Sequence, residues 1–182
     1  MARNRSAPAV GHAQDIADSW ARERPDLDPL DYLLPIYLIR IGRIVERVGS
    51  QRSKRTVGLS GSEIRVLMAL RRAGGDYARR PTDLFRALLV TSGAMTKTVD
   101  RLSALGLVRR RPDPADKGGF LVHLTPKGKK TADESMTEVA HASILSRQRI
   151  SLSKQERKVF TKLCERILLD FEADAEIEES LR

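Results

Sequence analysis

Apolar residues recur at helical spacing between Leu30 and Val48, in the run LDYLLPIYLIRIGRIVERV. The spacing predicts one long helix, and Pro35 either begins this helix or kinks it. The apolar positions cover more than one stripe, so we expect the helix to pack against a partner subunit as well as against its own chain. These positions are Leu34, Tyr37, Leu38, Ile41, Ile44, Val45 and Val48.

A shorter helix is predicted over residues 59–75, LSGSEIRVLMALRRAGG. Ser60 and Glu63 have capping-box spacing at its start, and a Gly-Gly pair ends it. Pro81 then marks the first turn of another short helix, and Thr91 is a suitable N-cap for the helix after that. Two short helices joined by a tight connection, with the second amphipathic, form a helix-turn-helix pattern.

The helix that follows Thr91, in TSGAMTKTVDRLSALG, has an unusual polar side. Small groups that can form hydrogen bonds gather at its N-terminal end, and Gly106 ends the helix. Helical periodicity places Met95, Val99, Leu102 and Leu105 on the apolar side. The polar side holds Ser92, Gly93, Thr96, Lys97, Asp100 and Arg101.

Two strand-like runs, LVRRR and GFLVHLT, flank the turn-rich PDPADKG and predict a β-hairpin over residues 107–124. A hairpin directly after a helix-turn-helix is a wing. Asp113 and Asp116 offer paired carboxylates in the turn, although such residues more often cap backbone amides.

Two helices are predicted after the wing. A Thr-Pro pair begins a long helix that we expect to reach about Arg149, and Ser153 with Glu156 forms another capping box before a last helix. The apolar face of the last helix comprises Val159, Phe160, Leu163, Cys164, Ile167, Leu168 and Phe171.

Composition supports a mainly helical fold, because 41% of the 182 residues are hydrophobic and only 4% are aromatic. The formal net charge of +9 at pH 7 indicates a polyanionic partner. The charge is unevenly spread, since residues 79–130 are strongly basic whereas residues 165–182 are mostly acidic. The basic region, which overlaps the helix-turn-helix and the wing, is therefore the predicted contact surface.

These residue types suit double-stranded DNA. A recognition helix enters the major groove by its N-terminal end, where small residues allow close approach and exposed amides attract phosphate. In isolation the same residues could form an ordinary capped helix, and the three arginines of the hairpin could form an exposed strand edge; their combination favours DNA. The predicted contacts are Ser92, Gly93, Thr96, Lys97, Arg101, Arg111 and Lys117.

The runs LSGSEIRVLMALRRAG, PTDLFRALLVTSGAMTKTVDRLSALGLVRRRPDPADKGGFLVHLTPKGK and LSKQERKVF closely resemble the MarR family of winged-helix transcriptional regulators. The resemblance implies a homodimer bound to a pseudo-palindromic operator. It places Asp116 at the acidic residue of the family's wing motif Asp-x-Arg, where Gly118 replaces the arginine. It also places Arg80 where a serine often precedes the proline of the third helix.

The resemblance further implies a pocket for a small anionic or aromatic effector. Candidate pocket residues are Trp20, Tyr32, Tyr37 and Arg65. The tyrosines have a second interpretation as dimer core, because large aromatic residues dominate buried interfaces.

The predicted fold is mainly α with a small β-hairpin wing, in which a winged helix-turn-helix lobe joins a helical dimerisation lobe. We expect a mobile basic arm over residues 1–24, with a short helix around 16–22, and an N-terminal dimerisation helix over 25–57. The DNA-binding lobe is expected over 58–124, with the recognition helix at about 91–105 and the wing at about 107–124. C-terminal dimerisation helices are expected over 125–182.

Other chemistry is not indicated. No nucleophile, base and orienting group recur together and no phosphate loop is present, so we expect no enzyme. We also expect no cofactor and no metal site, because His12, His123 and His141 lack ligand spacing. Cys164 is interpreted as a small hydrophobe rather than a redox sensor. A single cysteine and the lack of a signal peptide or membrane segment predict a cytoplasmic protein.

The sequence therefore predicts a regulator that binds double-stranded DNA sequence-specifically as a homodimer, and that leaves its operator when an effector binds. The alternative is a protein-interaction or nonspecific DNA-binding module that has lost operator reading.

Overall fold

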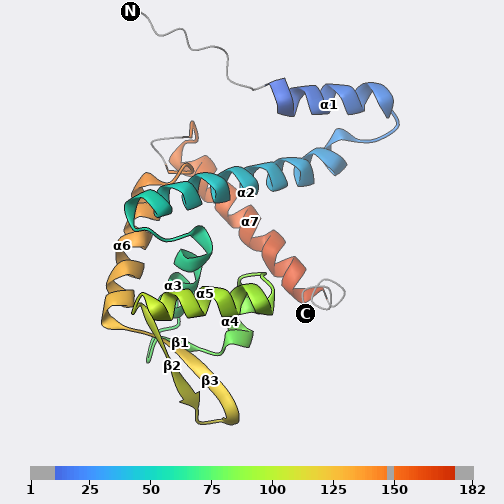
Figure 1. The fold of residues 1–182 in the computed structure, drawn as a ribbon. Helices are drawn as coiled ribbons and strands as arrows, with labels where there is room; N and C mark the ends of the chain where they lie inside the picture. Colours follow the sequence, from blue (N-terminus) through green and yellow to red (C-terminus); the bar gives the residue numbers. More distant parts are fainter. Residues whose placement is uncertain (1–10, 147–149, 175–182) are drawn as a thin grey trace, which may run out of the picture. The chain divides into compact units, whose positions relative to one another are not determined.

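The computed structural model describes residues 11–146 and 150–174 (Figure 1). The chain divides into two compact units between Arg47 and Val48. This division falls inside one helix, α2 (Pro29–Thr56). The structure is mainly helical with one small antiparallel sheet, which confirms the predicted fold class.

The N-terminal unit contains α1 (Gly11–Glu23) and the first part of α2. The short helix expected around 16–22 lies within α1, which is longer than predicted. Pro35 lies inside α2, so it does not begin the helix. The helix begins at Pro29 instead, where the side chain of Asp28 accepts a hydrogen bond from the backbone N–H of Leu30 at 2.9 Å.

The C-terminal unit contains the predicted helix-turn-helix and wing (Figure 1). Its three strands pair antiparallel in the order β1-β3-β2. The sequence did not predict β1, which is only two residues long. After the last part of α2, the elements are α3 (Gly61–Arg72), β1 (Ala78–Arg79), α4 (Pro81–Ala87), α5 (Ser92–Ala104), β2 (Val108–Asp113), β3 (Asp116–Leu124), α6 (Pro126–Ala142) and α7 (Lys154–Ala173).

Local capping signals act as predicted. Ser60 and Glu63 form both hydrogen bonds of a capping box at the start of α3, and Ser153 and Glu156 do the same for α7. Thr91 caps α5, because its hydroxyl accepts a hydrogen bond from the N–H of Ala94 at 3.2 Å. These contacts satisfy backbone donors that each helix leaves unpaired at its first turn.

One hydrophobic core joins α3, α4, α5 and the sheet. The predicted apolar side of α5 supplies Met95, Val99 and Leu102 to this core. Leu105 is the C-cap of the helix and is 37% exposed, so it lies outside the core. The largest fully buried side chains are Leu67, Leu70, Leu84, Met95, Leu102, Val66, Val99 and Val122.

Residues at the start of α6 lock the end of α5 to the wing. The hydroxyl of Thr125 donates to the carbonyl of Gly106 at 2.7 Å and accepts from the N–H of Gly128 at 3.0 Å. The ammonium of Lys127 donates to the carbonyl of Leu105 at 3.0 Å. A Cβ atom on Gly128 would lie 1.9 Å from the carbonyl oxygen of Leu107, so only glycine fits there.

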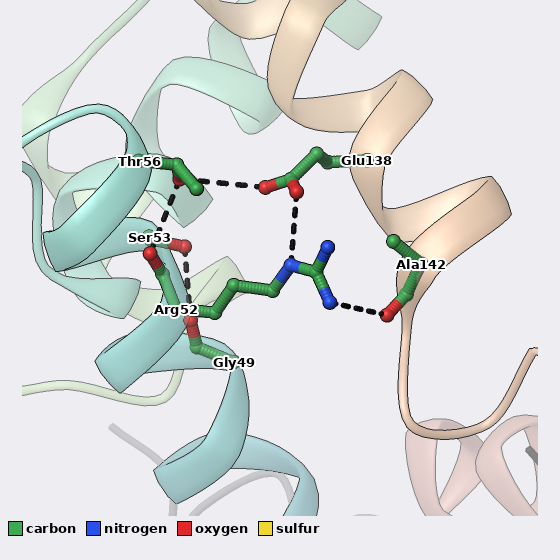
Figure 2. A network of polar contacts seen from close by, with 6 residues as sticks. All are labelled: Gly49, Arg52, Ser53, Thr56, Glu138 and Ala142. Carbon is green, nitrogen blue, oxygen red and sulfur yellow. Dashed lines mark hydrogen bonds and ion pairs between the residues drawn. The ribbon is translucent and has the colours of Figure 1, made fainter.

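A polar network joins the last part of α2 to the end of α6, within the C-terminal unit (Figure 2). The guanidinium of Arg52 donates to the carboxylate of Glu138 at 2.9 Å and to the carbonyl of Ala142 at 3.1 Å. Thr56 donates to the same carboxylate at 3.4 Å. Arg52 therefore caps the C-terminus of α6, where a cation is favourable.

The expected end of α6 near Arg149 was wrong. The helix ends at Ala142, because Ser143 leaves the helical conformation (φ −56°, ψ 148°) and its hydroxyl accepts the N–H of Leu145 at 3.2 Å. Arg149 itself lies outside the described residues. The next helix, α7, has no buried residue, and most of its predicted apolar face is exposed.

Candidate nucleic-acid interface

The N-terminal end of α5 presents small polar residues to solvent. Ser92, Gly93, Thr96 and Lys97 are all exposed, whereas Met95 on the opposite side is buried. A Cβ atom on Gly93 would meet nothing within 4 Å, so packing within the chain does not require a glycine at this position. Among the described residues Lys97 has no hydrogen-bond or ion-pair partner. This end of α5 is therefore open to an external ligand.

Arg101 differs from the other predicted contacts on α5. Its guanidinium forms an ion pair with the carboxylate of Glu63 at 2.6 Å, and that carboxylate is only 5% exposed. Glu63 also accepts the N–H of Ser60 at 2.6 Å. Arg101 thus ties α5 to the start of α3, and this role competes with the predicted contact to DNA.

The arginines of β2 fall into two groups. Arg110 forms an ion pair with Asp100 of α5, and its guanidinium lies over the ring of Phe120 at 4.9 Å. Side chains alternate along a strand, so Arg109 and Arg111 lie on the other face of the hairpin. Both are exposed and, within the described residues, both lack a partner.

The tip of the wing is irregular. The β2–β3 pairing is regular as far as Pro112 opposite Phe120, but Asp113 pairs with Asp116, which leaves residues 117–119 as a bulge. Lys117 is exposed in this bulge. Bulges redirect a strand and re-aim its side chains. The strand pairing therefore does not determine the direction of the Lys117 side chain.

Asp113 anchors the turn beside this bulge. One oxygen of its buried carboxylate accepts the N–H of Ala115 at 2.9 Å, and the other accepts a hydrogen bond from Nε of Arg80 at 2.5 Å. The Arg80 hydrogen bond, helped by the Ala115 amide, lowers the pKa of Asp113 below its ordinary value, and the same bond raises the pKa of Arg80. Asp113 thus caps a backbone amide, as the turn composition indicated.

Arg80 occupies the N-cap position of α4 without making a side-chain cap, because its guanidinium is directed to Asp113 instead. Pairing therefore divides the basic region. Arg80, Arg101 and Arg110 are bound to carboxylates inside the unit. The exposed cations that remain without a partner among the described residues include Arg86, Lys97, Arg109, Arg111 and Lys117.

The local sequence separates the paired arginines from the free ones only in part. Arg109 and Arg86 are free cations that the list of predicted contacts omitted, whereas Arg101 was included although it is paired. The three consecutive arginines of β2 alternate between faces, and this alternation was a usable signal. The partner of Arg80 lies 33 residues away in sequence, so no local pattern indicated it.

The predicted effector residues are divided between the two units. Trp20, Tyr32 and Tyr37 belong to the N-terminal unit and Arg65 to the other, and their grouping stays a prediction. Trp20 is 49% exposed, and the buried hydroxyl of Tyr32 has no hydrogen-bond partner in the part of the chain that the structure describes. Cys164 on α7 is partly buried.

Two negative findings apply to the described residues. The ranges 11–146 and 150–174 contain no group of three His, Cys, Asp or Glu side chains arranged to hold a metal ion. They also contain no helix with the length and apolar character needed to span a bilayer.

Comparison with known proteins identifies relatives of this architecture. Residues 57–117 match the sequence profile of the MarR family. The HTH-type transcriptional regulator PecS of Dickeya dadantii (strain 3937) is 33% identical over 114 residues, which make up 63% of this chain and 68% of PecS. The match thus spans about two thirds of the length of this relative.

Solved structures of similar fold include wild-type MarR from E. coli in its apo form, with a TM-score of 0.63 and 26% identity over 74% of this chain and 96% of MarR. Sco3205, a MarR family transcriptional regulator from Streptomyces coelicolor in complex with DNA, has a TM-score of 0.65. Its identity is 23%, over 82% of this chain and 92% of Sco3205, and this likeness bears on the fold alone.

Proposed function

Since this chain belongs to the MarR family of transcriptional regulators, we propose that it binds double-stranded DNA sequence-specifically, as a homodimer on a pseudo-palindromic operator. We further propose that it represses transcription by occupying the operator and that a small anionic or aromatic effector releases it.

The observation that carries the proposal is the open N-terminal end of α5, where Gly93 has no internal packing role and Lys97 has no partner among the described residues. The helix start supplies exposed amides and a positive dipole end, and small side chains let it approach base edges closely. The exposed wing cations Arg109, Arg111 and Lys117, which lack a partner within the described ranges, suit the phosphate backbone beside it. Sco3205, which shares the fold, is described in complex with DNA.

Exposed apolar helix faces support a homodimer. On α6 and α7 many large apolar side chains lie at the surface, and no residue of α7 is buried. A soluble monomer rarely exposes so many large apolar side chains on two helices, and a second copy would cover them by symmetry. The exposed residues are Met136, Val139, Val159, Phe160, Leu163, Leu168, Leu169 and Phe171.

Sedimentation equilibrium tests the dimer. We expect a mass twice that of the chain, and we expect Leu163→Glu with Phe160→Glu to shift it towards the monomer, because charges would be buried in the interface. A monomeric wild-type protein at micromolar concentration would contradict the proposal.

A hollow in the C-terminal unit supports an anionic effector. It has a volume of about 370 Å³ and lies beside the network of Figure 2, lined by Val48, Arg52, Arg55, Thr56, Ala142 and Ile144. This size lies in the range of ligand pockets. The hollow combines apolar walls with the guanidinium groups of Arg55 and Arg52, of which Arg52 also pairs with Glu138. A ligand releases DNA only if it binds better to a form that fits DNA poorly.

Fluorescence anisotropy tests operator binding. The probes are the intergenic duplex beside the protein's own gene and a scrambled duplex, at near-physiological salt. Specific regulators prefer their site by roughly a thousandfold or more. Such a preference supports the proposal and provides the assay for effector screening. Equal and salt-sensitive binding to both duplexes would favour a nonspecific DNA-binding module.

A further inference from the structure

The wing tip carries a cation whose position the strand pairing does not determine. Lys117 lies in the bulge of residues 117–119, and regular pairing ends at Pro112 opposite Phe120. Pro112 has no N–H to donate, so it adds no ladder bond of its own. Some other contact must fix the direction of the tip relative to α5.

Asp113 is placed to provide this contact. Its side chain is 4% exposed, and it joins two parts of the chain, the turn at Ala115 and the guanidinium of Arg80. A buried carboxylate is retained only where hydrogen bonds or opposite charges compensate its lost hydration. Here Arg80 and the Ala115 amide supply that compensation.

The backbone at Arg80 is rigid on both sides. Arg79 pairs with Val122 in the sheet, and Pro81 begins α4. The helix-turn-helix follows directly, and the buried Leu84 fixes α4 in the core. The hydrogen bond from Arg80 to Asp113 therefore ties the wing tip to the segment between β1 and α4, which leads into the recognition helix.

We propose that Arg80 is a positioning residue for DNA binding, which acts through Asp113 to hold the wing tip and Lys117 at a fixed angle to α4 and α5. The inference rests on the proposed DNA-binding function. The competing role for Arg80 is a direct contact to a DNA phosphate, and the two roles predict different mutant behaviour.

The test compares Arg80→Gln, Asp113→Asn and the double variant in the anisotropy assay. Asn retains an oxygen for the Ala115 amide while the ion pair is lost. If the pair positions the tip, each single variant should weaken operator binding by roughly threefold to tenfold, and the double variant should be no weaker than either. The matched control is Arg79→Gln, since among residues 11–146 and 150–174 the Arg79 side chain bonds only to the carbonyl of Ala78.

A Lys117→Ala background separates positioning from a general loss of charge. In that background Arg80→Gln should have no further effect, because the group that it positions is gone. An equal loss with and without Lys117 would overturn the proposal. Weaker operator binding by Arg80→Gln, with unchanged binding by Asp113→Asn, would also overturn the proposal. It would indicate that Arg80 contacts a DNA phosphate directly. Arg80→Lys should bind the operator better than Arg80→Gln but less well than the wild type, because lysine keeps the positive charge but lacks the planar guanidinium.

Hydrogen exchange in the protein without DNA tests the positioning role of Arg80 independently of operator binding. The Ala115 amide should exchange faster in Arg80→Gln than in the wild type, while amides of α3 stay protected. Unchanged exchange at Ala115 would refute the positioning role. If the wild type binds no duplex but Ala115 loses protection in Arg80→Gln, the proposed function fails while the structural link between Arg80 and the wing stands.

Discussion

The start of α5 and the start of α6 are built from the same local parts but face different surroundings. Thr91 and Thr125 are both N-caps, each accepting a hydrogen bond from the backbone N–H three residues later. Each first turn contains a glycine, Gly93 or Gly128. A Cβ on Gly128 would collide with a carbonyl at 1.9 Å, whereas one on Gly93 would meet nothing within 4 Å.

The nearby lysines repeat this difference. Lys127 donates to the carbonyl at the end of α5, while Lys97 has no partner among the described residues. The start of α6 is thus an internal contact that holds the wing against the core. The start of α5 is a surface open to a ligand. A capped helix start with glycine and lysine is therefore a binding surface only where the fold leaves it uncovered.

The largest expected effect is on stability, from disrupting the contact between α6 and Leu107. Gly128→Ala should lower the free energy of unfolding by about 3 kcal/mol, because the new methyl group overlaps a backbone carbonyl that cannot move without disturbing β2. Urea unfolding measures this change. A variant as stable as the wild type would show that the close approach of α6 and Leu107 is not a constraint.

The next effect concerns the lysines. Lys97→Ala should weaken operator binding by on the order of 1 to 3 kcal/mol if the side chain reaches a base, with relaxed sequence preference and unchanged stability. Lys127→Ala should instead reduce stability by about 0.5 to 1 kcal/mol, because the C-terminal carbonyl of α5 loses its donor. Anisotropy and urea unfolding on both variants measure the contrast. The reverse pattern would contradict the division between an open surface at α5 and an internal contact at α6.

Gly93→Ala sharpens the comparison at the glycines. Alanine in an exposed helix should raise the free energy of unfolding by up to about 1 kcal/mol, because it restricts the unfolded chain. Operator binding should weaken in the same variant, since the methyl group stands between the helix and the groove. Loss of stability would show that Gly93 has an internal role.

The smallest expected effect is the pH dependence of the wing anchor. The lowered pKa of Asp113 means that its stabilising contribution is fully present above the pKa of the unfolded chain, about 3.9, and is lost as pH falls through the lower folded value. The stability difference between wild type and Asp113→Asn should therefore be largest above about pH 5 and shrink in acid. Urea midpoints measured against pH test this. In Arg80→Gln the urea midpoint should depend less on pH than in the wild type. A stability difference between wild type and Asp113→Asn that grows in acid would contradict the stabilising role of the ionised Asp113.

Much of the fold was determined by local sequence. The capping residues Ser60, Thr91 and Ser153 set helix starts that the structure confirms, because each cap is a contact within four residues. The turn residues between the two strand-like runs determined the hairpin in the same way. The alternation and helical spacing of apolar residues predicted which sides of α3 and α5 form the core.

Local sequence patterns thus predicted most of the elements, though not β1 or the end of α6. They also predicted most of the core and the exposed front of α5, including Ser92, Gly93, Thr96 and Lys97. Only the tertiary structure decided which cations are free. Arg80, Arg101 and Arg110 look like DNA contacts in sequence, yet each is bound to an acid brought from another element. The physical reason is range: capping and periodicity act between neighbours along the chain, whereas ion pairs form between any groups that the fold brings within a few ångströms.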